Sequence, residues 1–160
     1  MPRRALSVEV DAPCEAVFDL IHDYDRRLSW DSMLSEARLL AGASVAGVGV
    51  RSRCVGTWRS GFLAMETEYV QFVRGRVSAV KLTNHPPFFR EFAATIQHEA
   101  LGPRSSRVTY IYSFRARPSF LEPIMNAWIA REVQSRLDSL RVYLSGREPR
   151  VLKASFRWKH

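Results

Sequence analysis

The stretch at residues 118–146, PSFLEPIMNAWIAREVQSRLDSLRVYLSG, decides the fold. Apolar side chains recur along it at steps of three and four, which is the spacing of one face of an α-helix. Those side chains are Leu121, Ile124, Met125, Trp128, Ile129, Val133, Leu137, Leu140 and Leu144. Ser119 and Glu122 have the spacing of a capping box. A helix over residues 123–144 is roughly 33 Å long, so it crosses a whole small domain.

The two halves of this helix differ in composition. Over residues 120–130 only Glu122 and Asn126 are polar, so this half is apolar nearly all round. Over residues 131–141 the outer face is charged, and Glu132 and Arg136 have the favourable i,i+4 spacing. The second half is therefore predicted to be a surface helix, whereas the first half must be covered on more than one side. A curved sheet, a bound apolar molecule and a partner subunit are the three candidates for that cover.

The chain before this helix starts with one strand and two short helices. Residues 5–11 alternate between apolar and polar side chains, which is typical of a half-buried strand. Asp11 and Pro13 then open a short helix with an apolar stripe, and a second short helix is predicted over residues 26–31.

The middle of the chain is predicted to form six further strands, at residues 35–40, 48–56, 65–73, 76–83, 89–99 and 107–116. The joins between them are too short for parallel crossovers, so neighbouring strands must be antiparallel. We therefore predict an α+β fold, in which a seven-stranded bent antiparallel sheet wraps around the long C-terminal helix. The two short helices follow the first strand.

The composition is that of an ordinary globular protein with an excess of positive charge. Hydrophobic residues make up 46% and charged residues 25% of the 160 residues, and the formal net charge is +8. We expect one domain over residues 1–146 and a basic tail over residues 147–160. The tail holds five cations and one anion. Its aromatic residues among cations are compatible with nucleic acid or a membrane surface, but we favour a tail that extends the sheet or lies in solvent.

Several classes of protein are excluded by simple counts. Cys14 and Cys54 are too few and too far apart for a disulfide framework or a zinc site, so no metal is expected. The basic N-terminus is not followed by the apolar segment of a signal peptide. No run of about 18 apolar residues can span a bilayer. These observations predict a cytoplasmic protein with no membrane span. Because the charge excess outside the tail is spread thinly, no nucleic-acid partner is expected.

The N-terminal third carries a family resemblance. The sequences VEVDAP at residues 8–13 and AVFDLI at residues 16–21, followed by Trp30 and Asp31, resemble the opening of the START/Bet v 1-like (SRPBCC) superfamily. More narrowly, the chain is similar to bacterial polyketide cyclase/dehydrase-like and lipid-transport proteins. The resemblance covers roughly residues 5–145 and implies a helix-grip fold with an internal cavity. It does not supply a reaction centre, because these motifs build the scaffold.

Apolar and aromatic side chains are the candidates for lining such a cavity. Two strand rows and the first half of the long helix supply most of them, and Trp30 is a candidate to close one end. The candidate ligand-binding residues are Trp30, Phe92, Ile96, His98, Tyr110, Tyr112, Ile124, Met125 and Trp128. The alternative is a solid core filled by the same side chains, and for Trp30 packing at a corner between helix and sheet is an equal alternative.

The sequence does not decide whether its polar candidate residues face the cavity. Glu66 and Glu68 share one strand face, and the sequence leaves open whether that face or the one carrying Thr67 points inward. His98 stands in an apolar strand row, which suits a buried donor or an acid–base group as well as a core histidine with a backbone partner. His22 lies near a predicted helix end, where surface solvation explains it better than metal binding.

The expected function is non-covalent binding of a small, mainly apolar ligand in a cavity between the sheet and the long helix. The first alternative is a polyketide cyclase or aromatase acting in the same cavity, with its acid–base group among His98, Glu66, Glu68, Tyr110 and Tyr112. The second alternative is an interaction module in which the apolar first half of the helix forms a homodimer or binds another protein. The sequence implies no cofactor, and no catalytic residue is named.

Overall fold

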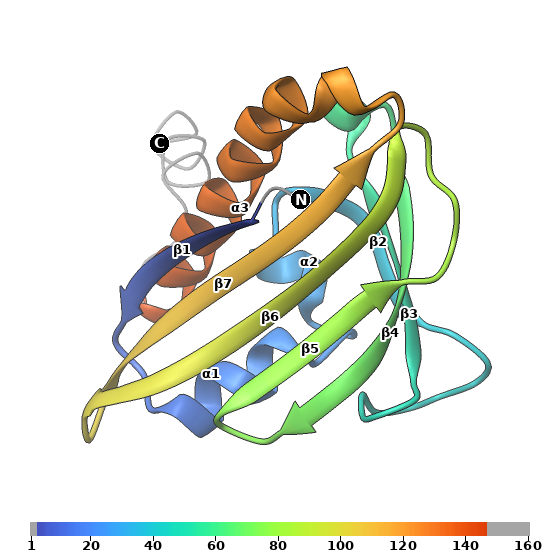
Figure 1. The fold of residues 1–160 in the computed structure, drawn as a ribbon. Coiled ribbons are helices and arrows are strands. Elements are labelled where there is room, and N and C mark those ends of the chain that lie inside the picture. Colours follow the sequence, from blue (N-terminus) through green and yellow to red (C-terminus); the bar gives the residue numbers. More distant parts are fainter. Residues whose placement is uncertain (1–2, 147–160) are drawn as a thin grey trace, which may run out of the picture.

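The computed structural model describes residues 3–146, which form seven strands and three helices (Figure 1). Two short 3₁₀ turns, at Trp58–Ser60 and Ser119–Leu121, complete the fold. The chain order is β1 (Arg3–Val10), α1 (Cys14–Ile21), α2 (Arg27–Trp30), β2 (Leu34–Leu39), β3 (Arg51–Gly56), β4 (Ala64–Val73), β5 (Val77–Leu82), β6 (Phe89–Gly102), β7 (Ser105–Ala116) and α3 (Glu122–Leu144). The basic tail lies outside the described residues.

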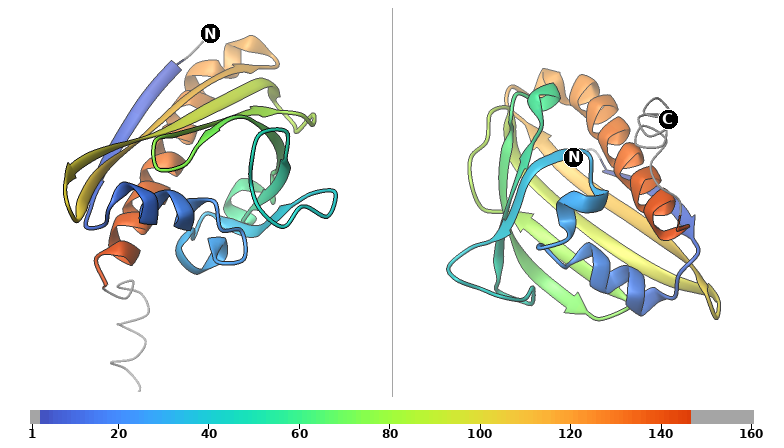
Figure 2. Two further views of the ribbon diagram at one scale, coloured as in Figure 1. Left: turned by 90° about the horizontal axis from the view of Figure 1, so that it is seen from below. Right: turned by 180° about the vertical axis from the view of Figure 1, so that it is seen from behind.

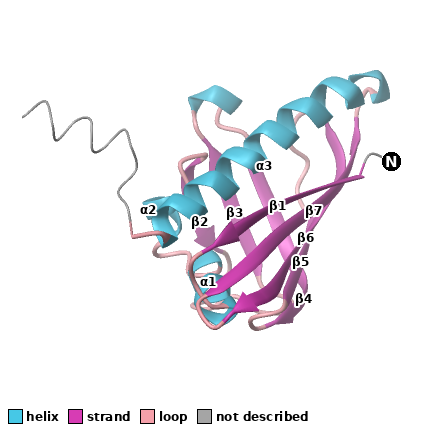
Figure 3. Ribbon diagram, turned by 90° about the vertical axis from the view of Figure 1, so that its left-hand side faces the viewer, coloured by secondary structure: helices cyan, strands magenta, loops and turns pink. Residues whose placement is uncertain are grey.

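All seven strands belong to one antiparallel sheet with the order β1-β7-β6-β5-β4-β3-β2. The sheet curls strongly, and all three helices lie on its inner side (Figure 2). α3 runs along the inside of this curl, with α1 and α2 near its C-terminal half (Figure 3). The predicted helix-grip architecture is therefore confirmed, including the two short helices after the first strand.

The second half of α3 packs as its sequence pattern predicts. Ile129, Val133, Leu137 and Leu140 are buried against the sheet, and α3 contacts β1 more than any other element. The predicted capping box is absent. The Glu122 carboxylate instead accepts a hydrogen bond from the backbone nitrogen of Ala116 at 3.1 Å, which ties the start of α3 to the end of β7.

The first half of α3 corrects an expectation. Its apolar side chains were predicted to be covered on more than one side, but Ile124 is 69% exposed. Phe120, in the 3₁₀ turn just before α3, is 76% exposed. Only the inward side chains of this half, such as Met125 and Trp128, pack against the core. The outer face of this half is therefore uncovered in the single chain.

The register of β4 decides which side chains face the helices. Met65 and Thr67 point inward with Tyr69, and the intervening glutamates point to the outer face, where Glu66 pairs with Arg53 at 2.9 Å. An irregularity in the pairing with β5 follows Tyr69 and leaves Val70 as the extra residue. This bulge returns the next aromatic residue, Phe72, to the inner side, where its ring contacts those of Phe18 and Tyr69.

Within residues 3–146, no helix combines the length and the apolar character needed to cross a bilayer.

Candidate functional site

A cavity of about 180 Å³ lies between the inner face of the sheet and α3. Its sheet wall comes from β2 to β7, and its opposite wall comes from α3, α2 and the segment that joins α1 to α2. Cavities form here because a curled sheet and a straight helix diverge, and the side chains between them do not fill the gap. Most of the wall is apolar, and its larger polar side chains come from the segment that joins α1 to α2, from α2, from β4 and β7, and from the middle of α3.

Four of the nine predicted ligand-binding residues lie on the cavity wall. Phe92 and Ile96 come from β6, Tyr110 from β7 and Trp128 from α3. The three strand residues occupy the inward positions of a period-2 pattern, and Trp128 lies next to the buried Ile129 on α3. The sheet rows and the helix stripe thus meet around the cavity.

The other five predicted ligand-binding residues do not line the cavity. Trp30 is 5% exposed and packs beneath the Arg27 guanidinium, 5.1 Å from the ring centroid. The buried Tyr112 bonds through its hydroxyl to the Asn126 side-chain oxygen at 2.9 Å. Met125 packs against the core, whereas Ile124 points outward.

The fifth, His98, belongs to the inward row of β6 but lies beyond the end of the cavity. α1 covers it there, with the Phe18 ring 5.4 Å from the imidazole. Neither ring nitrogen has a hydrogen-bond partner among residues 3–146, and burial lowers the pKa of His98 to about 4. His98 is therefore a neutral core side chain at pH 7.

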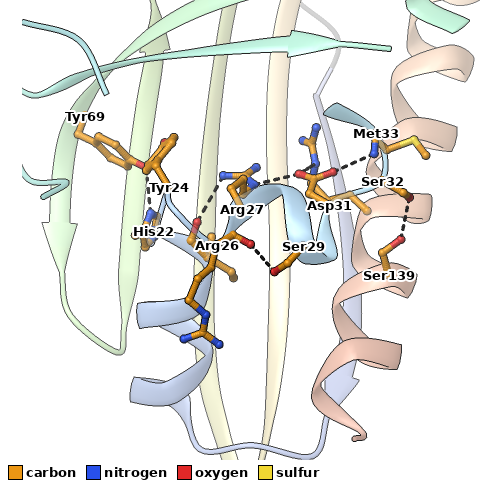
Figure 4. Close-up of polar contacts among 12 residues, drawn as sticks. His22, Tyr24, Arg26, Arg27, Ser29, Asp31, Ser32, Met33, Tyr69 and Ser139 are labelled. Atoms are coloured by element: carbon orange, nitrogen blue, oxygen red, sulfur yellow. Dashed lines mark hydrogen bonds and ion pairs between the residues drawn. The ribbon is translucent and has the colours of Figure 1, made fainter. Parts of the chain in front are cut away.

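A chain of three hydrogen-bonded side chains forms part of the polar wall (Figure 4). The Nδ1 of His22 lies 2.9 Å from the Tyr69 hydroxyl, which shares a second hydrogen bond of 2.7 Å with the Tyr24 hydroxyl. All three residues line the cavity. The expectation that His22 is solvated at the surface is wrong, because the end of α1 is packed against β4 and the residue is only 9% exposed.

Burial sets the protonation of this chain. Desolvation, helped by the Arg27 and His98 charges, lowers the pKa of His22 to about 3, so the imidazole is neutral at pH 7. Desolvation also raises the pKa values of Tyr24 and Tyr69, so both phenols keep their protons. The wall therefore presents neutral groups that donate and accept hydrogen bonds without carrying charge.

A second polar group lies beside it and is charged. Asp31, which is 0% exposed, is held between Arg27 and Arg136, whose Nε atoms lie 2.9 and 2.8 Å from the same carboxylate oxygen. The backbone nitrogen of Met33 donates to the other oxygen at 3.1 Å. Burial opposes ionisation of Asp31, but the two cations outweigh it, and its pKa lies below the ordinary value.

Two sequence patterns point to this charged group, although neither was interpreted in this way from the sequence. Arg27 and Asp31 are spaced i,i+4 in the short helix, and Arg136 shares a stripe with Ile129, Val133 and Leu140. A cation within an apolar stripe points to a buried partner. The partner itself, on a different element, was not recognisable from the sequence.

Metal ligands are not assembled in the part of the chain that the structure describes: no three His, Cys, Asp or Glu side chains come together there. Cys14 and Cys54 are both free thiols.

Solved structures of similar shape are numerous, although their sequences are distant. The Zhui aromatase/cyclase from Streptomyces sp. R1128 superposes with a TM-score of 0.78 at 13% identity, covering 90% of this chain and 93% of that one. A START superfamily protein from Mycobacterium smegmatis gives 0.63 at 14% identity, covering 86% and 98%. Norcoclaurine synthase from Thalictrum flavum, in complex with dopamine and hydroxybenzaldehyde, gives 0.69 at 10% identity, covering 92% and 88%. At these identities the likeness establishes the fold alone.

Sequence comparison establishes the family. No curated protein matches the chain significantly. The profile of one protein family does match it, over residues 1–145, which is nearly the whole chain. The chain therefore belongs to the family described as polyketide cyclase / dehydrase and lipid transport.

Proposed function

We propose that this protein binds a small, mainly apolar molecule in the cavity between the sheet and α3. The observation that carries the proposal is the cavity itself, with about 180 Å³ of space and largely apolar walls. An apolar cavity of roughly 150 Å³ is enough to bind benzene, so this one suits a molecule with one or two rings. Removal of apolar surface from water supplies affinity at about 25 cal/mol per Å².

The polar groups on the wall orient such a ligand. Tyr24 and Tyr69 offer hydroxyls to a carbonyl or hydroxyl oxygen, while the aromatic rings of Phe92 and Trp128 face the apolar body. Two of the similar structures support an aromatic ligand: one is an aromatase/cyclase, and the other was solved with dopamine and hydroxybenzaldehyde.

Toluene is a suitable first probe because it has no polar group. Titration followed by ¹H–¹⁵N NMR is expected to shift the amide signals of residues around the cavity in a saturable way. Ala94→Phe, on the cavity wall, should abolish the shifts because the added ring occupies the space. Ala93→Phe is the matched control, because its side chain projects from the opposite face of the same strand. Equal responses of both variants, or no saturable shifts in the original protein, would contradict the proposal.

An enzyme acting in the same cavity is the second candidate. The hydrogen-bonded chain of His22, Tyr69 and Tyr24 favours it, because a neutral imidazole next to a phenol can move a proton. Of the acid–base candidates expected from the sequence, Glu66 and Glu68 lie on the outer face, and His98 lies under α1. The Tyr112 hydroxyl bonds to Asn126, whereas Tyr110 lines the cavity but makes no hydrogen bond to another side chain among residues 3–146. Turnover of an aromatic polyketide precursor that Tyr69→Phe abolishes, with binding retained, would establish this activity over simple binding.

A further inference from the structure

The cavity wall carries two guanidinium groups, from Arg27 and Arg136, at its junction with α2 and α3. Behind them, fully buried, lies the single carboxylate of Asp31. Both Nε atoms approach the same oxygen of that carboxylate. One negative charge is therefore shared by two positive charges in a region largely removed from water.

The two arginines are not equivalent. Arg27 is fixed, because its Nε donates to Asp31 at 2.9 Å (Figure 4). In addition, one Nη donates to the Ile21 carbonyl at 3.4 Å, and the guanidinium lies over the rings of Tyr24 and Trp30. These contacts hold α2 against the end of α1. The Asp31 carboxylate alone neutralises the charge of Arg27.

Arg136 makes fewer hydrogen bonds within the protein than Arg27 does. Its Nε is 2.8 Å from the Asp31 oxygen but does not make a hydrogen bond to it, because the N–H is not directed at that atom. Neither terminal Nη makes a hydrogen bond to any of residues 3–146, and the Nε is the atom of Arg136 that pairs with Asp31. Arg136 lines the cavity, so these terminal N–H donors are available to a ligand there, and their fork matches a carboxylate.

Glu132 is the other charged residue on this wall, one helical turn before Arg136. The order Glu then Arg at i,i+4 favours an ion pair, yet none forms between these two side chains, because Arg136 is turned toward Asp31. Glu132 therefore does not neutralise Arg136 by contact, but its charge opposes the approach of an anion.

We propose that the ligand of this cavity carries a carboxylate head group on its apolar body, and that Arg136 binds this head group. This inference rests on the proposed ligand-binding function and narrows it to the class of aryl or alkyl carboxylic acids. The head group would supply the acceptor that the Nη atoms lack, because the single carboxylate of Asp31 is shared between Arg136 and Arg27.

The test compares three probes that share one methylphenyl ring: toluene, 4-methylbenzamide and 4-methylbenzoate. The last two are nearly isosteric and differ in charge at pH 7. We expect 4-methylbenzoate to bind the full chain at least tenfold more tightly than 4-methylbenzamide, as measured by NMR titration. Arg136→Gln should reduce this ratio to about one while toluene still binds, because Asp31 keeps Arg27 as its partner.

Two further variants check the assignment. Arg131→Gln removes an exposed cation from the same helix and should leave the ratio unchanged, which controls for net charge. Glu132→Gln should raise the ratio, because it removes the opposing charge. If Arg136→Gln does not fold, Arg136→Lys keeps a cation beside Asp31 and loses the fork, and it should lower the ratio several-fold.

The outcomes separate the two proposals. If toluene and the amide bind but the carboxylate binds no more tightly, the carboxylate inference is wrong and the apolar cavity function stands. If none of the three probes binds, the proposed function fails and the inference fails with it. A preference for the carboxylate that persists in Ala94→Phe would mean adsorption to the basic surface and would also overturn the inference.

Discussion

The imidazole of His22 and the phenol of Tyr69 lie 2.9 Å apart, and their hydrogen bond joins the end of α1 to the middle of β4. The two residues are 47 positions apart in the chain. Because Tyr69 also bonds to Tyr24, its hydroxyl holds the segment between α1 and α2 against the sheet. This contact closes one side of the cavity.

Removing that hydroxyl tests the contact. Tyr69→Phe leaves the Nδ1 of His22 and the hydroxyl of Tyr24 without their partner inside the protein, so we expect a loss of about 1–3 kcal/mol in the free energy of unfolding. Tyr110→Phe is a matched control on the same cavity wall, because no hydrogen bond joins the Tyr110 hydroxyl to residues 3–146. Urea denaturation measures both, and equal losses would contradict the role given to Tyr69.

The buried histidines predict how stability depends on pH. The pKa of His22 is about 3 in the folded protein against an ordinary value of 6.5, so the unfolded chain binds more protons between those values. Stability must therefore fall as pH falls below about 6.5. At pH 5 the His22 contribution is a loss of about 2 kcal/mol relative to pH 8.

His98 acts in the same direction, because its pKa is lowered to about 4. Urea denaturation at pH 8 and pH 5 measures the effect, and His22→Gln should reduce the difference between the two values. A protein equally stable at both pH values would show that these imidazoles are solvated.

Trp128 should respond to truncation less than a packed aromatic side chain does. Phe114 is 0% exposed and lies in the core, so Phe114→Ala should cost about 3–5 kcal/mol. Trp128 lies beside empty space, so fewer contacts are lost and Trp128→Ala should cost less than about 3 kcal/mol. Thermal or urea denaturation compares the two variants, and a cost for Trp128→Ala as large as that for Phe114→Ala would indicate a filled core.

The uncovered outer face of α3 gives a further prediction. Because Ile124 is 69% exposed, Ile124→Lys should change the free energy of unfolding by no more than about 0.5 kcal/mol. A clear loss of stability that depends on protein concentration would instead show that a second copy covers this face. Urea denaturation at two protein concentrations, with sedimentation analysis, distinguishes these results.

The fold was predictable because its signals are local. The apolar residues of α3 recur with a period of 3.6, and those of β6 and β7 recur with a period of 2, so each pattern can be recognised within one short stretch of sequence. For this reason Trp128, Phe92 and Tyr110 were assigned to inward faces correctly. The burial of Ile124 was predicted wrongly, because an apolar residue on a helix does not reveal whether anything lies against it.

The polar wall was not predictable in the same way. The burial of His22 depends on β4 packing against the end of α1, and the inward position of Tyr69 depends on a register that the sequence left open. The bulge at Val70 then changes the phase of β4, which no alternation pattern reveals. The grouping of Arg27, Asp31 and Arg136 likewise arises only when α2 meets α3.

The central claim is that the space beside Trp128 admits an apolar molecule. The most direct measurement uses a variant in which Trp30, Trp58 and Trp158 are replaced by phenylalanine, so that Trp128 is the only tryptophan and can be excited selectively. Bromobenzene, an apolar heavy-atom quencher, should quench this fluorescence with a saturable dependence on concentration, and Ala94→Phe should remove the saturable component. Quenching that rises only linearly, to the same extent with and without Ala94→Phe, would show that Trp128 borders no ligand cavity.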